Sequence, residues 1–307
     1  MHKLITFITA AMMFAVSAAA QQPTAKEFND RYQLLVSKLG PSGVGIETLL
    51  ERWEKAYPED VDMLLGKFTY YFTKSQSKSI VQKEQDKYLG VKPVLSLKDS
   101  TGKKVNYFEE VSYDDEMFGL AQKAIEKAIQ VCPDRLDLRF MKSASLIGYE
   151  KESPDMALSY LKGLAAYNGS QHPKWTYPGT DNVDYDFFSA AMQEYCYLFF
   201  TYGTPAAYEA FRDLSSTMLS YKPDDTLFLD NMGSYYLVAK QDNKTALKYY
   251  TKVLKLKSDD LTAIKNIILM ARKSKDTKLE KKYLPLLIKN TDSESEKLAA
   301  EARLKQL

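Results

Sequence analysis

An apolar pattern that occurs six times is the feature of this chain that most constrains its fold. Apolar or small residues stand at positions i, i+4 and i+7, and a residue that breaks or ends a helix usually follows at i+12. The clearest example consists of Ala121, Ile125, Ala128 and Pro133. The other five patterns begin at Ile46, Ala157, Phe211, Ala246 and Leu279.

The first residues of these patterns are separated by 75, 36, 54, 35 and 33 residues. Three of the five intervals lie close to the ~34 residues of a repeating helix–turn–helix unit. A unit of two helices cannot bury its apolar face alone, so such units stack on their neighbours. The sequence therefore predicts an all-α fold, built as an array of antiparallel helix pairs.

The two long intervals predict two insertions in the array. The longer excess matches residues 75–114, where two β-prone runs flank a turn with Gly102 and indicate a β-hairpin over Val94–Phe108. The shorter excess matches residues 168–186, a stretch rich in glycine, proline and aromatic residues. Insertions in repeat arrays map to loops, so both departures are compatible with stacking.

The segment from Asp230 to Leu256 resembles a tetratricopeptide repeat (TPR). Four residues match the small and aromatic positions of that family, namely Gly233, Tyr236, Ala246 and Tyr250. Ala121, Ile125, Ala128 and Pro133 match the second-helix pattern of the family without an insertion. Small residues let neighbouring helices approach closely, and large ones fill the groove beside them. The resemblance implies a right-handed superhelical array whose concave groove, lined by the first helix of each pair, binds peptides or proteins.

The N-terminus resembles an export signal over residues 1–20, with a short basic start, an apolar stretch and a small-residue cleavage site before Gln21. A membrane anchor is the alternative, but the apolar stretch is short for one. We expect the mature chain, 21–307, to be one TPR-like domain without a transmembrane segment. A charged last helix over 292–307 is expected to cap it. The predicted location is the periplasm, or outside the cell.

The chemistry of the chain argues against an enzyme. The sequence has 42 basic and 40 acidic side chains, which gives no reason to expect nucleic acid as a partner. The mature chain has one histidine, His172, and none of the short motifs that hold phosphate or metal. We therefore predict no catalytic residues, no metal and no cofactor. Cys132 and Cys196 are either a disulfide or, as we favour, two buried free thiols.

Two surfaces are candidates for binding. Asn231 and Tyr235 are expected to line the groove of first helices, where a protein or peptide partner would bind. Alternatively, the aromatic loop 172–188, with Trp175 and Tyr177, would stack on a glycan or another small ligand. These rings also fit a packing role that covers the gap opened by the insertion. The hairpin Val94–Phe108 either adds a strand to a neighbour or lies on the helices. Partner identity, repeat number and oligomeric state stay open.

Overall fold

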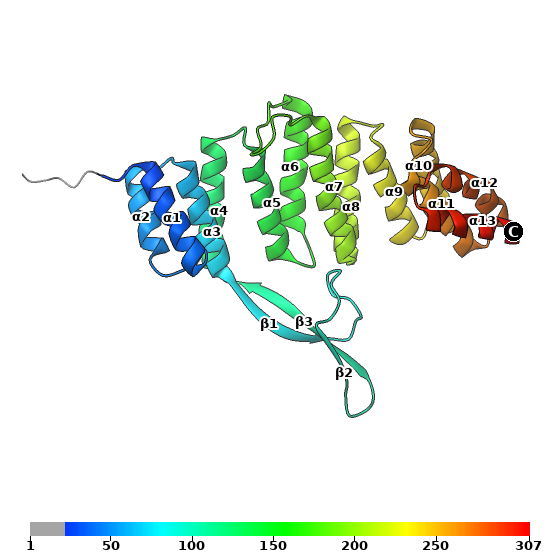
Figure 1. Ribbon diagram of the computed structural model, residues 1–307, viewed down its shortest axis with the longest axis horizontal. Coiled ribbons are helices and arrows are strands. Elements are labelled where there is room, and N and C mark those ends of the chain that lie inside the picture. The colour runs from blue at the N-terminus through cyan, green and yellow to red at the C-terminus, as the bar shows by residue number, and fades with distance from the viewer. Residues whose placement is uncertain (1–21) are drawn as a thin grey trace, which may run out of the picture.

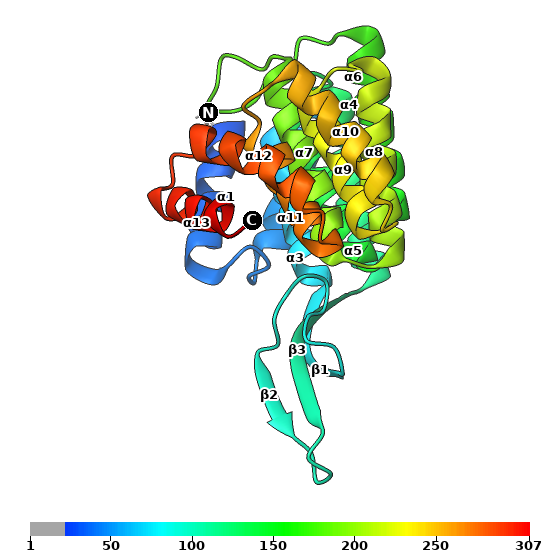
Figure 2. The same cartoon turned by 90° about the vertical axis from the view of Figure 1, so that its right-hand side faces the viewer.

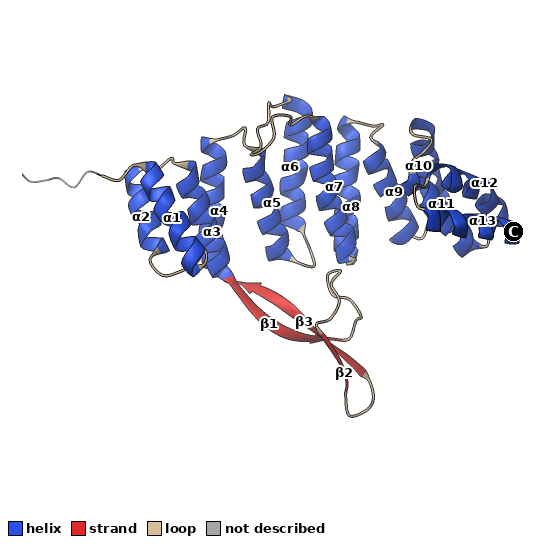
Figure 3. Cartoon of the chain, in the orientation of Figure 1, coloured by secondary structure: helices blue, strands red, loops and turns tan. Residues whose placement is uncertain are grey.

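The computed structural model describes residues 22–307, which form thirteen helices and three strands (Figures 1 and 3). The first helices of successive pairs are α1 (Ala25–Leu39), α3 (Val61–Ser75), α5 (Leu136–Glu150), α7 (Tyr185–Tyr202), α9 (Thr226–Val238) and α11 (Leu261–Ser274). The second helices are α2 (Ile46–Ala56), α4 (Asp115–Val131), α6 (Asp155–Gln171), α8 (Pro205–Tyr221), α10 (Asn243–Leu256) and α12 (Thr277–Asn290). The last helix is α13 (Glu294–Gln306).

The helix pairs stand side by side along the longest axis of the molecule (Figure 1). All six apolar patterns fall on second helices. Ala121, Ile125 and Ala128 on α4 are inaccessible to solvent, as are Ala246 and Tyr250 on α10. The predicted TPR-like array of antiparallel pairs is therefore confirmed.

Gly233 shows why a small residue is needed where the two helices of a pair cross. The ring of Tyr250, on α10, packs against Gly233 on α9 so closely that an added Cβ would lie 2.5 Å from Tyr250 Cε1. Tyr236, one turn further along α9, stacks instead on Tyr249, with 5.7 Å between the ring centroids. Pro133 follows the end of α4 and is exposed. The contact between Gly233 and Tyr250 explains why the repeat pattern pairs a small residue on the first helix with a large one on the second.

Helix boundaries follow local capping signals. Most helices begin after an aspartate, threonine or serine whose side chain accepts a hydrogen bond from the backbone of the first turn. The buried side chains form three clusters, centred on the N-terminal, central and C-terminal pairs. Each pair thus contributes to a core shared with its neighbours, as stacked repeats require.

The first insertion is larger than the predicted hairpin. It forms a three-stranded antiparallel sheet of β1 (Gln76–Lys83), β2 (Leu95–Lys98) and β3 (Lys104–Tyr113), with β3 in the centre. The predicted hairpin corresponds to β2 and β3. The polar strand β1 was missed, because it has no apolar alternation and becomes a strand by pairing with β3. Figure 2 shows this sheet, here called the β-arm, projecting beyond the helices from the ends of α3 and α4.

The β-arm contacts two further helix pairs. Gly90, with φ of +78°, packs on Thr201 of α7 so tightly that no Cβ fits there. Glu110 on β3 also pairs with Lys151 after α5, at 3.8 Å. The loop between β1 and β2 and the strand β3 therefore contact the helices, whereas β2 lies at the far end of the β-arm (Figure 1).

The second insertion is shorter than predicted. Helix α6 continues to Gln171, and His172 ends it in a left-handed conformation, so the loop spans 172–184 instead of beginning at 168. Helix α13 occupies the place expected for the capping helix. The predicted signal, 1–20, lies outside the described residues. Among residues 22–307 no helix has the length and apolar character to cross a membrane.

Candidate functional site

The first helices α7, α9 and α11 leave corresponding faces free of the core. Counted from the capping residue before each helix, positions 2, 6, 9 and 13 lie on one helical face. This stripe contains Asp186, Ala190, Gln193 and Tyr197 on α7, Leu227, Asn231, Ser234 and Val238 on α9, and Thr262, Asn266, Leu269 and Lys273 on α11. We call it the first-helix face.

Large apolar side chains on the first-helix face are partly open to solvent. Tyr197 is 62 % exposed, Leu227 and Val238 are 42 % exposed, and Leu269 is 45 % exposed. Single exposed apolar residues are common on protein surfaces. Here, however, each of three consecutive first helices carries at least one of them on the same helical face, and Tyr197 and Val238 stand at the same position of α7 and α9. Exposed apolar residues that gather on one face can mark a surface that a partner covers.

Asn231 lies on this face but is buried beneath a neighbour. Its amide nitrogen donates to Gln193 Oε1 at 2.6 Å and to Ser215 Oγ at 3.1 Å, and its oxygen accepts from Gln193 Nε2 at 3.0 Å. Ser215 also contacts the Cys196 thiol, 3.6 Å away. Asn231 thus links α7, α8 and α9 as part of the floor of the face.

Tyr235 points away from the first-helix face, toward α8. Its hydroxyl donates to Glu209 Oε1 at 2.7 Å, and Lys240 Nζ lies 2.8 Å from the same oxygen. The ring is buried between these groups and the Arg212 guanidinium, 5.8 Å from its centroid. The structure does not bring Tyr235 and Asn231 together at a surface. Their role in binding stays a prediction.

The aromatic loop is hydrogen-bonded to the turn before α5. Thr176 N donates to Asp134 O at 2.8 Å, and Leu136 N donates to Thr176 O at 3.0 Å. Trp175 is only 7 % exposed, and its indole nitrogen donates to Asn168 Oδ1 at 2.8 Å. The Arg139 guanidinium lies 5.1 Å from its ring centroid. These contacts match a packing role for the Trp175 ring more closely than an open platform for ligand stacking.

Tyr177 is half-buried beside Trp175, on the wall of a small hollow. The hollow measures about 420 Å³ and is also lined by Arg135, Pro178 and Asp181. The Arg135 guanidinium is occupied by Asp137, through contacts of 2.9 and 2.6 Å. The loop therefore offers one small hollow with an aromatic wall, in which ligand binding by Trp175 and Tyr177 stays a prediction.

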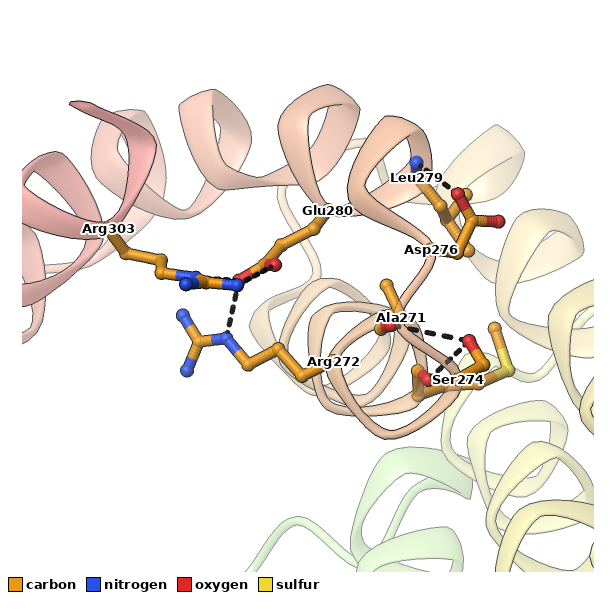
Figure 4. Close-up of polar contacts among 8 residues, drawn as sticks. Ala271, Arg272, Ser274, Asp276, Leu279, Glu280 and Arg303 are labelled. Atoms are coloured by element: carbon orange, nitrogen blue, oxygen red, sulfur yellow. Dashed lines mark hydrogen bonds and ion pairs between the residues drawn. The ribbon is translucent and has the colours of Figure 1, made fainter. Parts of the chain in front are cut away.

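An ion cluster at the C-terminal end was not anticipated from the sequence. The Glu280 side chain of α12 is buried and accepts from Arg272 of α11 at 2.7 Å and from Arg303 of α13 at 2.9 and 2.8 Å (Figure 4). Hydrogen bonds from Arg303 and Arg272 hold the pKa of Glu280 at about 2. Arg272 and Arg303 also line a hollow of about 450 Å³, together with Lys265 and Glu296. This hollow is lined by residues of α11, α12 and α13.

The cysteines and the acidic residues give no sign of redox or metal chemistry. Both cysteines are free thiols in this structure, with Cys196 buried and Cys132 half-buried. Burial raises the pKa of the Cys196 thiol to about 12, which disfavours the reactive thiolate. Within residues 22–307 no three side chains of histidine, cysteine, aspartate or glutamate gather as a metal site would require.

No protein-family model matches the sequence, and no curated protein matches it. Three solved structures are similar in helix arrangement. The first is YrrB, described as a TPR protein with an unusual peptide-binding site, which is 16 % identical with a TM-score of 0.35 over 81 % of this chain and 92 % of that one. The second is PilF of Pseudomonas aeruginosa, which is 13 % identical with a TM-score of 0.37 over 91 % of this chain and 99 % of that one. The third is the flexible tandem repeat domain of a bacterial cellulose synthase component, which is 13 % identical with a TM-score of 0.27 over 92 % of this chain and 97 % of that one. At these TM-scores the fold assignment rests on the helix pairs themselves.

Proposed function

We propose that this protein is a non-enzymatic interaction scaffold of the cell envelope, periplasmic or secreted, that holds a peptide segment or partner protein on its first-helix face. The observation that carries the proposal is that the first-helix face has a large exposed apolar side chain on each of α7, α9 and α11, with Tyr197 as the most exposed. Tyrosine is among the residue types that most often supply the affinity at protein interfaces, and apolar neighbours such as Leu227 and Val238 help to exclude water around it.

The support beneath the first-helix face suits recognition without rearrangement. The Gln193–Asn231–Ser215 hydrogen bonds join three helices directly under it. A surface that is already ordered loses little conformational entropy on binding, so more of the contact energy becomes affinity. Toward α13, the charged hollow with Lys265, Arg272 and Glu296 would orient the end of a bound segment.

The test compares two matched pairs of substitutions in pull-downs from the native envelope. Tyr197→Ala with Leu227→Ala changes the first-helix face. Tyr221→Ala with Leu256→Ala removes one tyrosine and one leucine of similar exposure from second helices α8 and α10. We expect the first pair to lose the partner and the second to retain it, with both folded because surface substitutions cost little stability. Equal recovery by the two pairs would rule out the first-helix face.

A second candidate function is glycan or small-ligand binding in the hollow of the aromatic loop. It is favoured by the wall that Tyr177 and the edge of Trp175 form together. Titration with an oligosaccharide panel should change tryptophan fluorescence in the parent protein but not in Trp175→Phe. Trp53 is fully buried in the N-terminal cluster and supplies a constant background. No change in either protein would remove this candidate.

A further inference from the structure

The β-arm has two edges that differ in how they are protected. On β1, Lys78 and Lys83 stand among polar residues, and Lys78 pairs with Glu109 of β3 at 2.8 Å. Charged side chains on an edge strand prevent pairing with other chains. On β2, the sequence from Leu95 to Leu97 has no charged residue and no proline, and all four residues of the strand are exposed. Between Leu95 and Leu97 the edge of β2 is therefore uncharged, and Lys98 is the one charged residue of this short strand.

The hydrogen-bond pattern tells which backbone groups of β2 are free. Asp99 N donates to Lys103 O at 2.9 Å where the hairpin closes. Bonded and non-bonded pairs alternate in an antiparallel ladder, so Leu97 and Leu95 bond to β3. The N–H and C=O groups of Ser96 and Lys98 then point to the open edge. Figure 1 shows β2 at the far end of the β-arm, clear of the helices, so an added strand would meet no other element.

The side chains of the β-arm separate into a covered and an open face. On one face, Tyr88 packs on Phe108 with 5.9 Å between the ring centroids, and Asn106 donates to Gln85 O at 2.9 Å. On the other face, the register places Leu95 and Leu97 beside Tyr107 and Val105. Leu95 is 50 % exposed and Leu97 is 49 % exposed. An incoming strand with apolar residues at alternate positions would cover these two leucines.

The charges around β2 define the ends of such a strand. Lys103 pairs with Glu84 at 2.6 Å, and Lys104 pairs with Asp86 at 2.7 Å. Lys92 precedes β2 and Lys98 is its last residue, and among the described residues neither has a carboxylate within ion-pair distance. A complementary segment would therefore carry acidic residues at its ends.

We propose that the free edge of β2 is a strand-addition site for an extended segment of a partner protein, with apolar residues at alternate positions and acidic residues at its ends. Main-chain hydrogen bonds to Ser96 and Lys98 would supply affinity, and the flanking side chains would supply specificity. A second copy of β2 fits less well. Symmetric pairing about Ser96 would place Lys98 opposite Val94 and leave both lysines without an acidic partner.

The test uses a fluorescein-labelled heptapeptide with three alternating valines, threonines between them and a glutamate at each end. Anisotropy titrations compare the full chain with two variants of one residue. Ser96→Pro removes the outward N–H, which an edge strand tolerates because that group does not bond to β3. Both variants lose the hydrogen bond that Ser96 Oγ donates to Asn106 Oδ1, at 2.6 Å, but Ser96→Ala keeps the backbone N–H.

We expect Ser96→Ala to bind the peptide like the parent chain and Ser96→Pro to bind at least about tenfold more weakly. Gln82→Pro, which removes an outward N–H from β1, should have no effect. The parent chain should also bind a peptide with lysine ends about tenfold more weakly, a comparison that needs no variant. Equal binding by Ser96→Pro and Ser96→Ala would overturn the proposal. So would no binding to the parent chain, or a dimer in sedimentation that Ser96→Pro abolishes.

Discussion

The contact between α7 and α9 and the contact between α9 and α11 use the same positions with different chemistry. In both, the fifth residue after the capping residue of one first helix reaches the capping aspartate of the next. The first contact joins Ser189 to Asp225, and the second joins Asp230 to Asp260. The two contacts thus use the same helix positions but differ in the side chain that faces the capping aspartate, which is a hydroxyl in one and a carboxyl group in the other.

At the first of these contacts, hydroxyl groups satisfy the capping carboxylate. Asp225 Oδ2 accepts from Tyr185 Oη at 2.7 Å and from Ser189 Oγ at 3.0 Å, while Oδ1 accepts from Leu227 N at 3.0 Å. Elsewhere the fifth position also supplies a donor, from Asn29 to Asp62 and from Lys265 to Glu296. In each of these three cases the donor at the fifth position meets a carboxylate on a neighbouring helix.

At the second contact, a carboxyl group stands where α1, α7 and α11 have a donor. Asp260 accepts from Ala263 N at 3.1 Å and pairs with Lys257 at 3.3 Å, but Asp230 Oδ1 has no donor. Burial, and secondarily the Asp260 carboxylate, raises the pKa of Asp230 to about 8. Asp230 must hold a proton to match its surroundings, which makes this contact sensitive to pH.

The largest expected effect is a loss of stability as the pH rises. The folded state holds the Asp230 proton up to about pH 8, whereas the unfolded chain releases it near pH 4. Between these values the folded state binds more protons, so the free energy of unfolding falls by about 1 kcal/mol per pH unit. Urea unfolding at pH 5, 6, 7 and 8 measures this slope.

Asp230→Asn is the control for that slope. The amide has the same shape, donates to Asp260 without titrating, and should make the free energy of unfolding less dependent on pH. The difference between the parent chain and the variant isolates Asp230 from the other ionisable groups. Parallel pH profiles for the two proteins would show that the two contacts do not differ in their need for a proton.

Asp225→Ala should have the next largest effect, at a contact in which hydroxyl groups supply the protons. The substitution removes the N-terminal cap of α9 and leaves the hydroxyls of Tyr185 and Ser189 without an acceptor. We expect it to lower the free energy of unfolding by about 2–3 kcal/mol, with a similar value at pH 5 and pH 8. A cost that disappears at pH 8 would make the two contacts equivalent.

The helices were predictable because their signals are local. Spacing of three and four residues identified all six second helices, and capping residues such as Asp225 and Asp260 set the starts of first helices. The sheet was only half predicted, since β1 depends on pairing with β3 across an intervening loop. Local patterns therefore set the elements, whereas contacts between distant segments set the insertions.

The candidate site was less predictable, because it depends on how each helix is rotated. Asn231 and Tyr235 are one turn apart, yet Gln193 of α7 covers the first and Glu209 of α8 binds the second. A helical spacing cannot show which residue of another helix lies opposite. The position of Asp230 could have been predicted from the sequence, since alignment of the capping residues places it at the same position as Ser189.

Ser189→Ala should have a moderate effect that sharpens the same comparison. Asp225 loses one of its two hydroxyl donors but keeps Tyr185, so the carboxylate stays partly satisfied. We expect a loss of about 1 kcal/mol in the free energy of unfolding, measured in urea. A cost as large as that of Asp225→Ala would mean that Tyr185 contributes nothing to this contact.

The smallest effect, and one that changes with pH, is expected for Asp260→Ala. At pH 5 Asp230 is protonated, so the substitution removes a cap and an acceptor and should cost about 1 kcal/mol. At pH 9 Asp230 has lost its proton, and removal of the nearby Asp260 carboxyl group relieves the repulsion on it, which offsets the lost cap. Urea unfolding of this variant and of Asp225→Ala at both pH values gives the comparison. A cost for Asp260→Ala that is the same at pH 5 and pH 9 would show that Asp230 and Asp260 do not share a proton.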